Sequence, residues 1–396
     1  MTDQLTQIDN AIDALLSDHD PTTMSAVEFR GHQFDHGLGA VHFPVGSGGL
    51  GLAPSLQSHV EKRIVDAGRE PEDPTMFFWH LAGPTILTHG SDEVKQRFLR
   101  PMYTGEEVWC QLFSEPGAGS DFAGLAAKAL RDGDEWVVNG QKVWNTLAHL
   151  ADWGMLVVRT DPSLPKHKGM TYFAVDMRSE GVDVRPLRQI TGEAEFNEVY
   201  LTDVRIPDAN RVGEVGEGWR AALTTLMNER TAIGGGTPEA GGGVIGELVN
   251  AWKSLPENER TSARRDAVMK LWAKAEALRL TNIRASQNRK VGNPGPEGSV
   301  GKTMSAELKK DVSELTVDLL GMAGQVDYDY TFRRPETLDL SGTDGGPRYA
   351  FLRARANSIE GGTTEIMANI LGEQVLGLPG EPRVDKDIAW IDVPRS

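Results

Sequence analysis

Residues 114–121 read Ser-Glu-Pro-Gly-Ala-Gly-Ser-Asp and directly follow a strand-like run, Val-Trp-Cys-Gln-Leu-Phe, at 108–113. Two glycines and a serine in a tight turn expose backbone N–H groups, and such a nest suits an anion, most often a phosphate. A plain hairpin loop has the same composition, so this turn by itself leaves both interpretations open. A second segment at 139–146, Asn-Gly-Gln-Lys-Val-Trp-Asn-Thr, predicts a turn followed by a strand that carries an aromatic ring and a hydroxyl.

Both segments lie in a region where the hydrophobic pattern is strand-like, and helical patterns flank it on either side. Strands are predicted at 135–138, 153–158, 170–175, 182–184, 196–201 and 204–207. Helices are predicted at 5–16, near 56–65, 85–87 and 94–99, and again at 219–233, 244–255, 262–287, 301–320 and 364–376. The chain of 396 residues is long for one core. We therefore expect an α-helical domain at 1–106, a β domain at 107–212 and an α-helical domain at 213–396.

The composition excludes several classes of function. The net charge is −16 and no basic stripe stands out, so nucleic-acid binding is not expected. No stretch of about 18 apolar residues occurs, so no membrane span is expected. The single cysteine, Cys110, lies in an apolar run, and the N-terminus lacks signal-peptide features, which together favour a cytoplasmic location. His32, His36 and His42 lack the spacing of a metal site, so no metal is expected.

The segments at 114–121 and 139–146, within a layout of helices, strands and helices, resemble the acyl-CoA dehydrogenase family over nearly the whole chain. The resemblance implies an N-terminal α-helical domain, a middle β-barrel or sandwich domain, a C-terminal four-helix bundle, and FAD as cofactor. In the family pattern these segments hold the flavin. The residues that would do so here are Gln111, Leu112 and Ser114 along the isoalloxazine, Trp144 and Thr146 at its other edge, and Gly119 and Ser120 near the pyrophosphate; Ser120 would also face the substrate.

A C-terminal segment at 358–366, Ser-Ile-Glu-Gly-Gly-Thr-Thr-Glu-Ile, resembles the family's Glu-Gly-Thr motif. The resemblance implies that Thr363 lies near the adenosine diphosphate part of FAD with Glu365 close by, and that Glu360 and Gly361 lie on the substrate side, with Gly361 beside the acyl group. A plain helix cap would explain Thr363 equally well from local sequence alone.

Desaturation of a thioester needs a carboxylate base at the α carbon and a cofactor that accepts hydride from the β carbon. In one branch of the family the base directly precedes Gly-Thr, but that position here is Gly361, and Glu360 comes one residue too early. In another branch, which includes isovaleryl-CoA dehydrogenase, a Glu-Arg pair on the helix after the β domain supplies the base. Glu229 and Arg230 occupy that place. We therefore expect Glu229 to be the base, with Glu360 as the alternative, and Arg230 to support the substrate near the CoA moiety; a solvated helix face is the structural alternative.

Two departures from the family pattern bear on assembly. The family's Arg-x-x-Phe-Gly, whose Arg reaches a neighbouring subunit's flavin, appears with Arg289 one residue short and without Phe. A family Gln-x-x-Gly-Gly-x-Gly appears at 318–324 as Asp-Leu-Leu-Gly-Met-Ala-Gly. The expected assembly is a homo-oligomer, dimer or tetramer, or a heteromer with a paralogous subunit, as in actinobacterial relatives that degrade steroid side chains.

The resemblance implies an FAD-dependent acyl-CoA dehydrogenase that forms a trans-2-enoyl-CoA, with hydride transfer to flavin N5 and an electron-transfer flavoprotein as acceptor. The alternatives are an acyl-CoA oxidase and a non-catalytic supporting subunit. A base on the helix after the β domain favours a branched, aromatic or steroid-side-chain acyl group over a straight chain.

Overall fold

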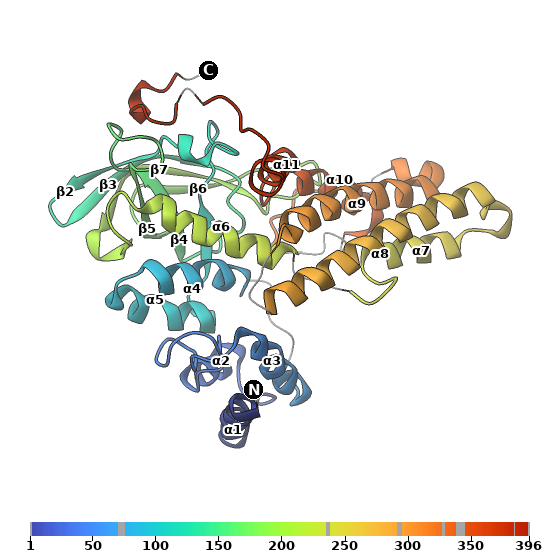
Figure 1. Cartoon of the computed structure of the whole chain (residues 1–396), viewed down its shortest axis with the longest axis horizontal. Helices are drawn as coiled ribbons and strands as arrows, with labels where there is room; N and C mark the ends of the chain where they lie inside the picture. Colours follow the sequence, from blue (N-terminus) through green and yellow to red (C-terminus); the bar gives the residue numbers. More distant parts are fainter. Residues whose placement is uncertain are drawn as a thin grey trace.

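The computed structural model describes residues 2–69, 76–234, 238–290, 295–326, 329–337, 345–383 and 385–394; the side chains of residues 2, 230–234, 289 and 290 are not described. Helices, then a sheet, then helices follow one another along the chain, as the sequence predicts (Figure 1). The domain boundaries at 106 and 212 stay expectations, although β1 begins at Trp109 and β8 ends at Val212.

The N-terminal part consists of helices α1 (Thr2–Asp18), α2 (Ala26–Asp35), α3 (Gln57–Asp66), α4 (Phe77–His89) and α5 (Asp92–Thr104). Ile8, Ile12 and Leu15 recur on one face of α1 and are fully buried against α2 and α3. The sequence reasoning missed α2, whose ten residues mix apolar and charged side chains without a clear stripe. Helix α5 joins the sheet through the ring of Phe98, which lies 5.2 Å from that of Trp109 between centroids.

The central sheet has β1 (Trp109–Leu112), β2 (Lys128–Asp132), β3 (Glu135–Lys142), β4 (Trp153–Arg159), β5 (Met170–Asp176), β6 (Val182–Pro186), β7 (Asn197–Pro207) and β8 (Arg211–Val212). Its order is β6-β7-β3-β2-β4-β5-β8, with β1 parallel to β4. Strands β4 and β5 are buried on both faces, and their successive side chains point to opposite sides of the sheet. In β4, Met155 and Val157 face the core shared with the N-terminal helices, whereas Leu156 and Val158 face a second core.

Three strand predictions were wrong in detail. The segment at 139–146 is not a turn and a strand: Asn139 to Lys142 complete β3, and Trp144 lies in the loop that follows. The two strands predicted at 196–201 and 204–207 form one strand, β7, in which Asp203 has φ 50°. Strand β2 was missed because its residues are mostly exposed and give no apolar alternation.

The C-terminal part contains α6 (Gly218–Gly234), α7 (Val244–Ser254), α8 (Ser262–Lys290), α9 (Glu297–Leu319), α10 (Gly346–Arg353) and α11 (Thr364–Ile370). Helices α7, α8 and α9 share a core, and α6 contacts α4, the sheet and α9. Figure 1 shows α6 running between the sheet and this bundle, so it joins the three parts. The helix predicted at 364–376 ends early because a π-helical turn follows at Leu371–Val375.

None of the helices in the described ranges combines the length and apolar character that a membrane crossing requires.

Candidate active site

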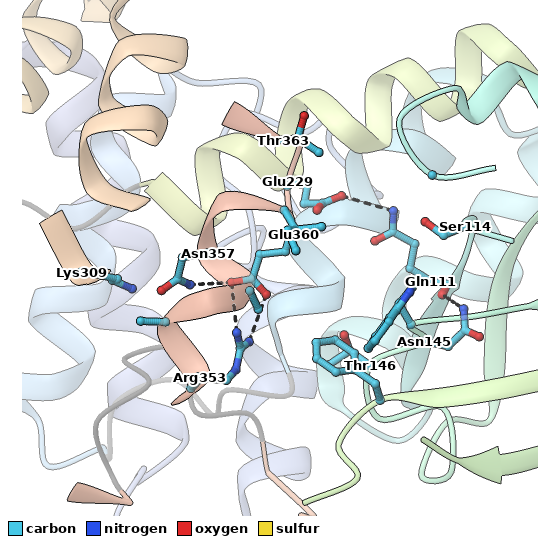
Figure 2. A pocket seen from close by; sticks show the side chains of 18 of the residues that line it. Gln111, Ser114, Asn145, Thr146, Glu229, Lys309, Arg353, Asn357, Glu360 and Thr363 are labelled. Carbon is cyan, nitrogen blue, oxygen red and sulfur yellow. Dashed lines mark hydrogen bonds and ion pairs between the residues drawn. The ribbon is translucent and has the colours of Figure 1, made fainter. Parts of the chain in front are cut away.

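A cavity of about 800 Å³ lies where the three parts meet. The loop after β1, the loop after β3, helix α6, helix α9 and the segment from 347 to 366 supply its walls. Most of the lining is apolar, and a few polar groups point into it (Figure 2). An enclosed apolar space with few polar groups is typical of a ligand site.

The loop at 114–121 is held in shape by a buried ion pair. Lys142 is fully buried, and its Nζ donates to Glu115 Oε1 at 2.7 Å and to the carbonyl oxygens of Phe113 and Val157. Glu115 is 8 % exposed and also accepts from the backbone N–H groups of Ala126 and Ala127. Burial lowers the pKa of Lys142, and the Glu115 carboxylate opposes that change. Because the charge is paired and hydrogen-bonded, the backbone of the loop is fixed.

The turn fixed in this way leaves space at its glycines. A Cβ atom added at Gly117 or Gly119 would meet nothing within 4 Å, and Gly119 and Ser120 line the cavity. The backbone here can therefore approach a bound group closely.

The loop after β3 presents Trp144 to the cavity in an unusual backbone conformation. Trp144 has φ 61° and is 57 % exposed. Its ring packs edge-to-face with the ring of Phe196, and the two ring centroids are 5.6 Å apart. A large aromatic residue in the left-handed region is rare, and its ring would normally be buried. Strain at a cavity wall of this kind indicates a functional constraint.

A ladder of hydrogen bonds holds the Trp144 loop from behind. Asn145 and Asn197 exchange backbone hydrogen bonds, each 3.0 Å long, and Asn197 Nδ2 donates to the Asn145 carbonyl. Arg334, from the segment at 329–337, donates to Asn197 Oδ1 at 2.8 Å. His149 bonds Asn197 Nδ2 through Nδ1 and the Pro335 carbonyl through Nε2, so the neutral tautomer with Nε2–H satisfies both contacts. Burial lowers the pKa of His149, and Arg334 adds to this.

Glu229 reaches the cavity from α6 and is tied to β1. Gln111 Nε2 donates to Glu229 Oε2 at 3.2 Å, and Asn145 Nδ2 donates to the Gln111 carbonyl at 2.8 Å (Figure 2). The strand alternation explains why Gln111 points there while its neighbours Cys110 and Leu112 face the second core. The candidate base is thus positioned by two residues of the predicted flavin segments.

Glu360 lines the same cavity but is already engaged. Its carboxylate accepts from Arg353 Nη1 and Nη2 at 3.3 and 3.1 Å and from Asn357 Nδ2 at 2.6 Å (Figure 2). Arg353 also forms an ion pair with Glu195, which is 2 % exposed. Burial raises the pKa of Glu195, and Arg353 opposes the rise. Gly361, at the position of the alternative family base, has φ 62°, a conformation that a glutamate would adopt only with strain.

The loop between η7 (Ala354–Ser358) and α11 is clamped independently of Glu360. Lys302 Nζ, from α9, donates to the carbonyl oxygens of Asn357 at 2.9 Å and Gly362 at 2.6 Å. Burial lowers the pKa of Lys302, and the Glu360 and Glu365 carboxylates oppose that change. Thr363 caps α11, accepting from the Ile366 N–H at 3.1 Å, as the local sequence predicts.

The structure brings most of the predicted site residues together around one cavity: Gln111, Ser114, Gly119, Ser120, Trp144, Thr146, Glu229, Glu360, Gly361 and Thr363. Two predicted contacts lie elsewhere. Leu112 is fully buried in the second core of the sheet, and Glu365 is exposed on α11. The side chains of Arg230 and Arg289 lie outside the described part of the structure, so those two predictions are not addressed.

Sequence reasoning missed the residues that position the site: Glu115 as an anchor, Lys142, Asn145, Asn197, Lys302, Arg353 and Asn357. For two of them a local signal existed, since Asn357 lies three residues and Arg353 seven residues before Glu360. The contacts of Lys302 and Asn197 join residues far apart in the sequence, so no local pattern predicts them.

Comparison with known families fits this architecture. Residues 110–204 match the acyl-CoA dehydrogenase middle domain, and residues 216–376 match the acyl-CoA dehydrogenase C-terminal domain. The chain belongs to the acyl-CoA dehydrogenase family. Acyl-CoA dehydrogenases are FAD-dependent oxidoreductases, and one solved relative of this fold is a mycobacterial glutaryl-CoA dehydrogenase in complex with FADH2.

Individual relatives come from mycobacteria. The acyl-CoA dehydrogenase FadE34 of Mycobacterium tuberculosis is 40 % identical over 87 % of this chain, which spans only 45 % of FadE34. The acyl-CoA dehydrogenase IpdE1 of Mycobacterium tuberculosis is 35 % identical, over 88 % of this chain and 86 % of IpdE1. Among solved structures, the ChsE4-ChsE5 complex from Mycobacterium tuberculosis gives a TM-score of 0.69 and 26 % identity, with 96 % of this chain and 99 % of that chain covered.

The cavity of this acyl-CoA dehydrogenase fits FAD. It offers an exposed indole at Trp144 for the ring system, hydroxyls at Ser114 and Thr146, and an open glycine turn at 117–120 for the phosphates. The buried Oδ1 of Asn145 has no hydrogen-bond partner among the described residues, so the wall holds an acceptor that a ligand donor would satisfy.

Proposed function

We propose that Glu229 is the base that removes the α proton of an acyl-CoA thioester in this FAD-dependent acyl-CoA dehydrogenase, forming a trans-2-enoyl-CoA. The observation that carries the proposal is the contrast between the two candidate carboxylates, Glu229 and Glu360. Glu229 receives a hydrogen bond from Gln111, a residue of the predicted flavin segment. Glu360 is held in place by a guanidinium and an amide.

The chemistry divides between the cofactor and the chain. FAD, when bound, supplies the acceptor for the β hydrogen. The residues proposed to hold it are Gln111, Ser114, Gly119, Ser120, Trp144, Thr146 and Thr363. The chain supplies the base, and the apolar walls exclude water and so strengthen the electrostatic contacts around the thioester.

Glu360 is the weaker candidate because proton abstraction would require it to leave its partners. A hydrogen bond to a charged group contributes about 1.5–3 kcal/mol, and three such bonds hold this carboxylate. Glu229 accepts a hydrogen bond from the Gln111 amide and lines the same cavity.

The assembly and the electron acceptor are further parts of the proposal. A relative of which this chain spans only 45 %, and a structural neighbour described as a ChsE4-ChsE5 complex, support a heteromer with a paralogous subunit over a homo-oligomer. An electron-transfer flavoprotein is the proposed acceptor. The single cysteine is buried, which is compatible with the proposed cytoplasmic location.

The test is an anaerobic titration of the FAD-loaded protein with a panel of straight, branched and aromatic acyl-CoAs, followed at the flavin absorption band. Wild type should bleach with at least one acyl class, and Glu229→Gln should slow bleaching by at least a thousandfold. Glu360→Gln should slow it by about tenfold or less. If the flavin of Glu360→Gln does not bleach while that of Glu229→Gln does, the assignment of the base is reversed.

A further inference from the structure

The cavity lining combines apolar and polar side chains. The apolar ones include Phe77, Phe78, Leu226, Val244, Val312 and Ile366, from helices α4, α6, α7, α9 and α11. One polar patch of the same lining consists of the Glu360 carboxylate with the Arg353 and Asn357 groups that hold it (Figure 2). A carboxylate in an apolar acyl site lowers the affinity for plain hydrocarbon, because burying its charge is costly.

The geometry of Glu360 leaves one acceptor position available. Oε1 accepts from Arg353 and Asn357, while among the described residues Oε2 accepts only from Arg353 Nη2. A carboxylate offers about four acceptor positions, so one on Oε2 is not used by these contacts. The Glu360 side chain keeps 28 % of its surface exposed, compared with 12 % for Arg353. Arg353 and Asn357 therefore fix the orientation of a carboxylate that lines the cavity.

Arg353 cannot serve as an anion site in place of Glu360. The guanidinium lies between two carboxyl groups, Glu360 at 3.1 Å and Glu195 at 3.2 Å. Arg353 would have to break its ion pairs with both carboxyl groups before it could bind a carboxylate on a substrate. Among the described residues of this patch, Glu360 offers an acceptor position, and Arg353 is paired with two carboxyl groups.

The Glu360 contacts are not needed to close the loop. Lys302 already bonds two carbonyl oxygens of that loop, and Thr363 caps the helix that follows it. A purely structural role would be served by apolar side chains of similar size, which would also pack better in this cavity. The presence of a carboxylate at Glu360, in place of an apolar side chain, therefore favours recognition of a ligand group.

We propose that Glu360, oriented by Arg353 and Asn357, accepts a hydrogen bond from a hydroxyl group on the acyl chain, so that the substrate is a bulky, hydroxylated acyl-CoA. This inference rests on the proposed function, because it takes the cavity to hold the acyl group. Glu360 is then a specificity-determining residue and takes no part in proton abstraction. A hydrogen bond to a charged acceptor contributes about tenfold to a hundredfold in affinity.

The experiment measures binding without turnover. In the FAD-loaded Glu229→Gln protein, with any subunit that copurifies, calorimetry gives Kd for 3-phenylpropanoyl-CoA and 3-cyclohexylpropanoyl-CoA and for their ring-hydroxylated counterparts. At least one hydroxylated thioester should bind about tenfold or more tightly than its parent. That preference should be lost in Glu229→Gln/Glu360→Met and reduced in Glu229→Gln/Glu360→Gln. The matched control, Glu229→Gln/Glu314→Gln, changes an exposed carboxylate on α9 outside the cavity and should keep the preference.

The inference is overturned if no hydroxylated thioester binds more tightly than its parent, or if the preference survives both substitutions at Glu360. Glu360→Gln keeps the size and the hydrogen-bonding oxygen, so it remains informative if Glu360→Met does not fold. Failure of the proposed function is a separate result: no acyl-CoA would bleach the flavin of the wild type, whatever the Kd ratios show.

Discussion

Replacing Lys142 by Met should strongly destabilise the loop at 114–121. Lys142 is fully buried and donates to Glu115 and to two backbone carbonyls. Methionine preserves the aliphatic volume and removes the charge. Among the described residues, the Glu115 carboxylate, 8 % exposed, then keeps only the N–H groups of Ala126 and Ala127 as partners.

The expected cost follows from this loss. Removing one partner of a buried ion pair costs about 3–5 kcal/mol, because the remaining charge stays desolvated. With an unfolding entropy of about 2.1 cal/mol/K per residue over 396 residues, the melting temperature should fall by roughly 4–6 °C. The double variant Lys142→Met/Glu115→Gln removes the orphan charge while its amide oxygen still accepts from the two N–H groups. It should therefore be at least about 1 kcal/mol more stable than Lys142→Met alone.

Hydrogen exchange measured by mass spectrometry gives the local free energy directly, with the Ala126 and Ala127 amides as reporters, and a thermal melt in excess FAD gives the global effect. Lys168→Met, at an exposed lysine between β4 and β5, is the matched control and should change stability by less than about 0.5 kcal/mol. The reasoning fails if Lys142→Met costs under about 1 kcal/mol, or if the double variant is no more stable than the single one.

Three more changes test other contacts. Asn145→Ala should lower the rate constant of flavin reduction about tenfold with KM nearly unchanged, because Gln111 loses its anchor and Glu229 its position; stopped-flow absorbance measures this, and a change in melting temperature alone would contradict it. Burial holds the pKa of His149 below its unfolded value, so stability is lost as the pH falls below about 6.5. Urea unfolding from pH 7.5 to 5 gives the free energy of unfolding as a function of pH. The slope of this free energy against pH should be smaller in His149→Phe than in wild type by up to about 1.4 kcal/mol per pH unit, and parallel curves would refute the assignment. Thr363→Ala should cost about 1 kcal/mol through loss of the α11 cap while Thr363→Ser retains it, as thermal melts would show.

The parts of the fold that short motifs specify could be predicted from the sequence. The glycine turn at 114–121 and the threonine cap at Thr363 are local, so their composition carries their conformation. The long amphipathic stretch of α1 gave its helix for the same reason. Strand alternation, applied more strictly, would also have predicted that Leu112 faces the core and Gln111 faces the cavity.

The positioning of the site could not be predicted, because it depends on contacts between distant segments. Trp144 was expected in a strand on the strength of its aromatic side chain, yet the loop held by Asn145 and Asn197 places it at φ 61°. The difference between Glu229 and Glu360 lies in their partners. No spacing in the sequence shows that one carboxylate faces an amide and the other a guanidinium.

The most direct test of the central claim is exchange of the α protons of a substrate analogue that cannot be desaturated, such as a 3-thia-acyl-CoA, in deuterated buffer. Mass spectrometry follows deuterium uptake on the FAD-loaded wild type, Glu229→Gln and Glu360→Gln proteins. If Glu229 is the base, wild type exchanges the proton, Glu360→Gln stays within about tenfold of it, and Glu229→Gln shows no exchange above the rate in buffer. Exchange that persists in Glu229→Gln and disappears in Glu360→Gln would contradict the account.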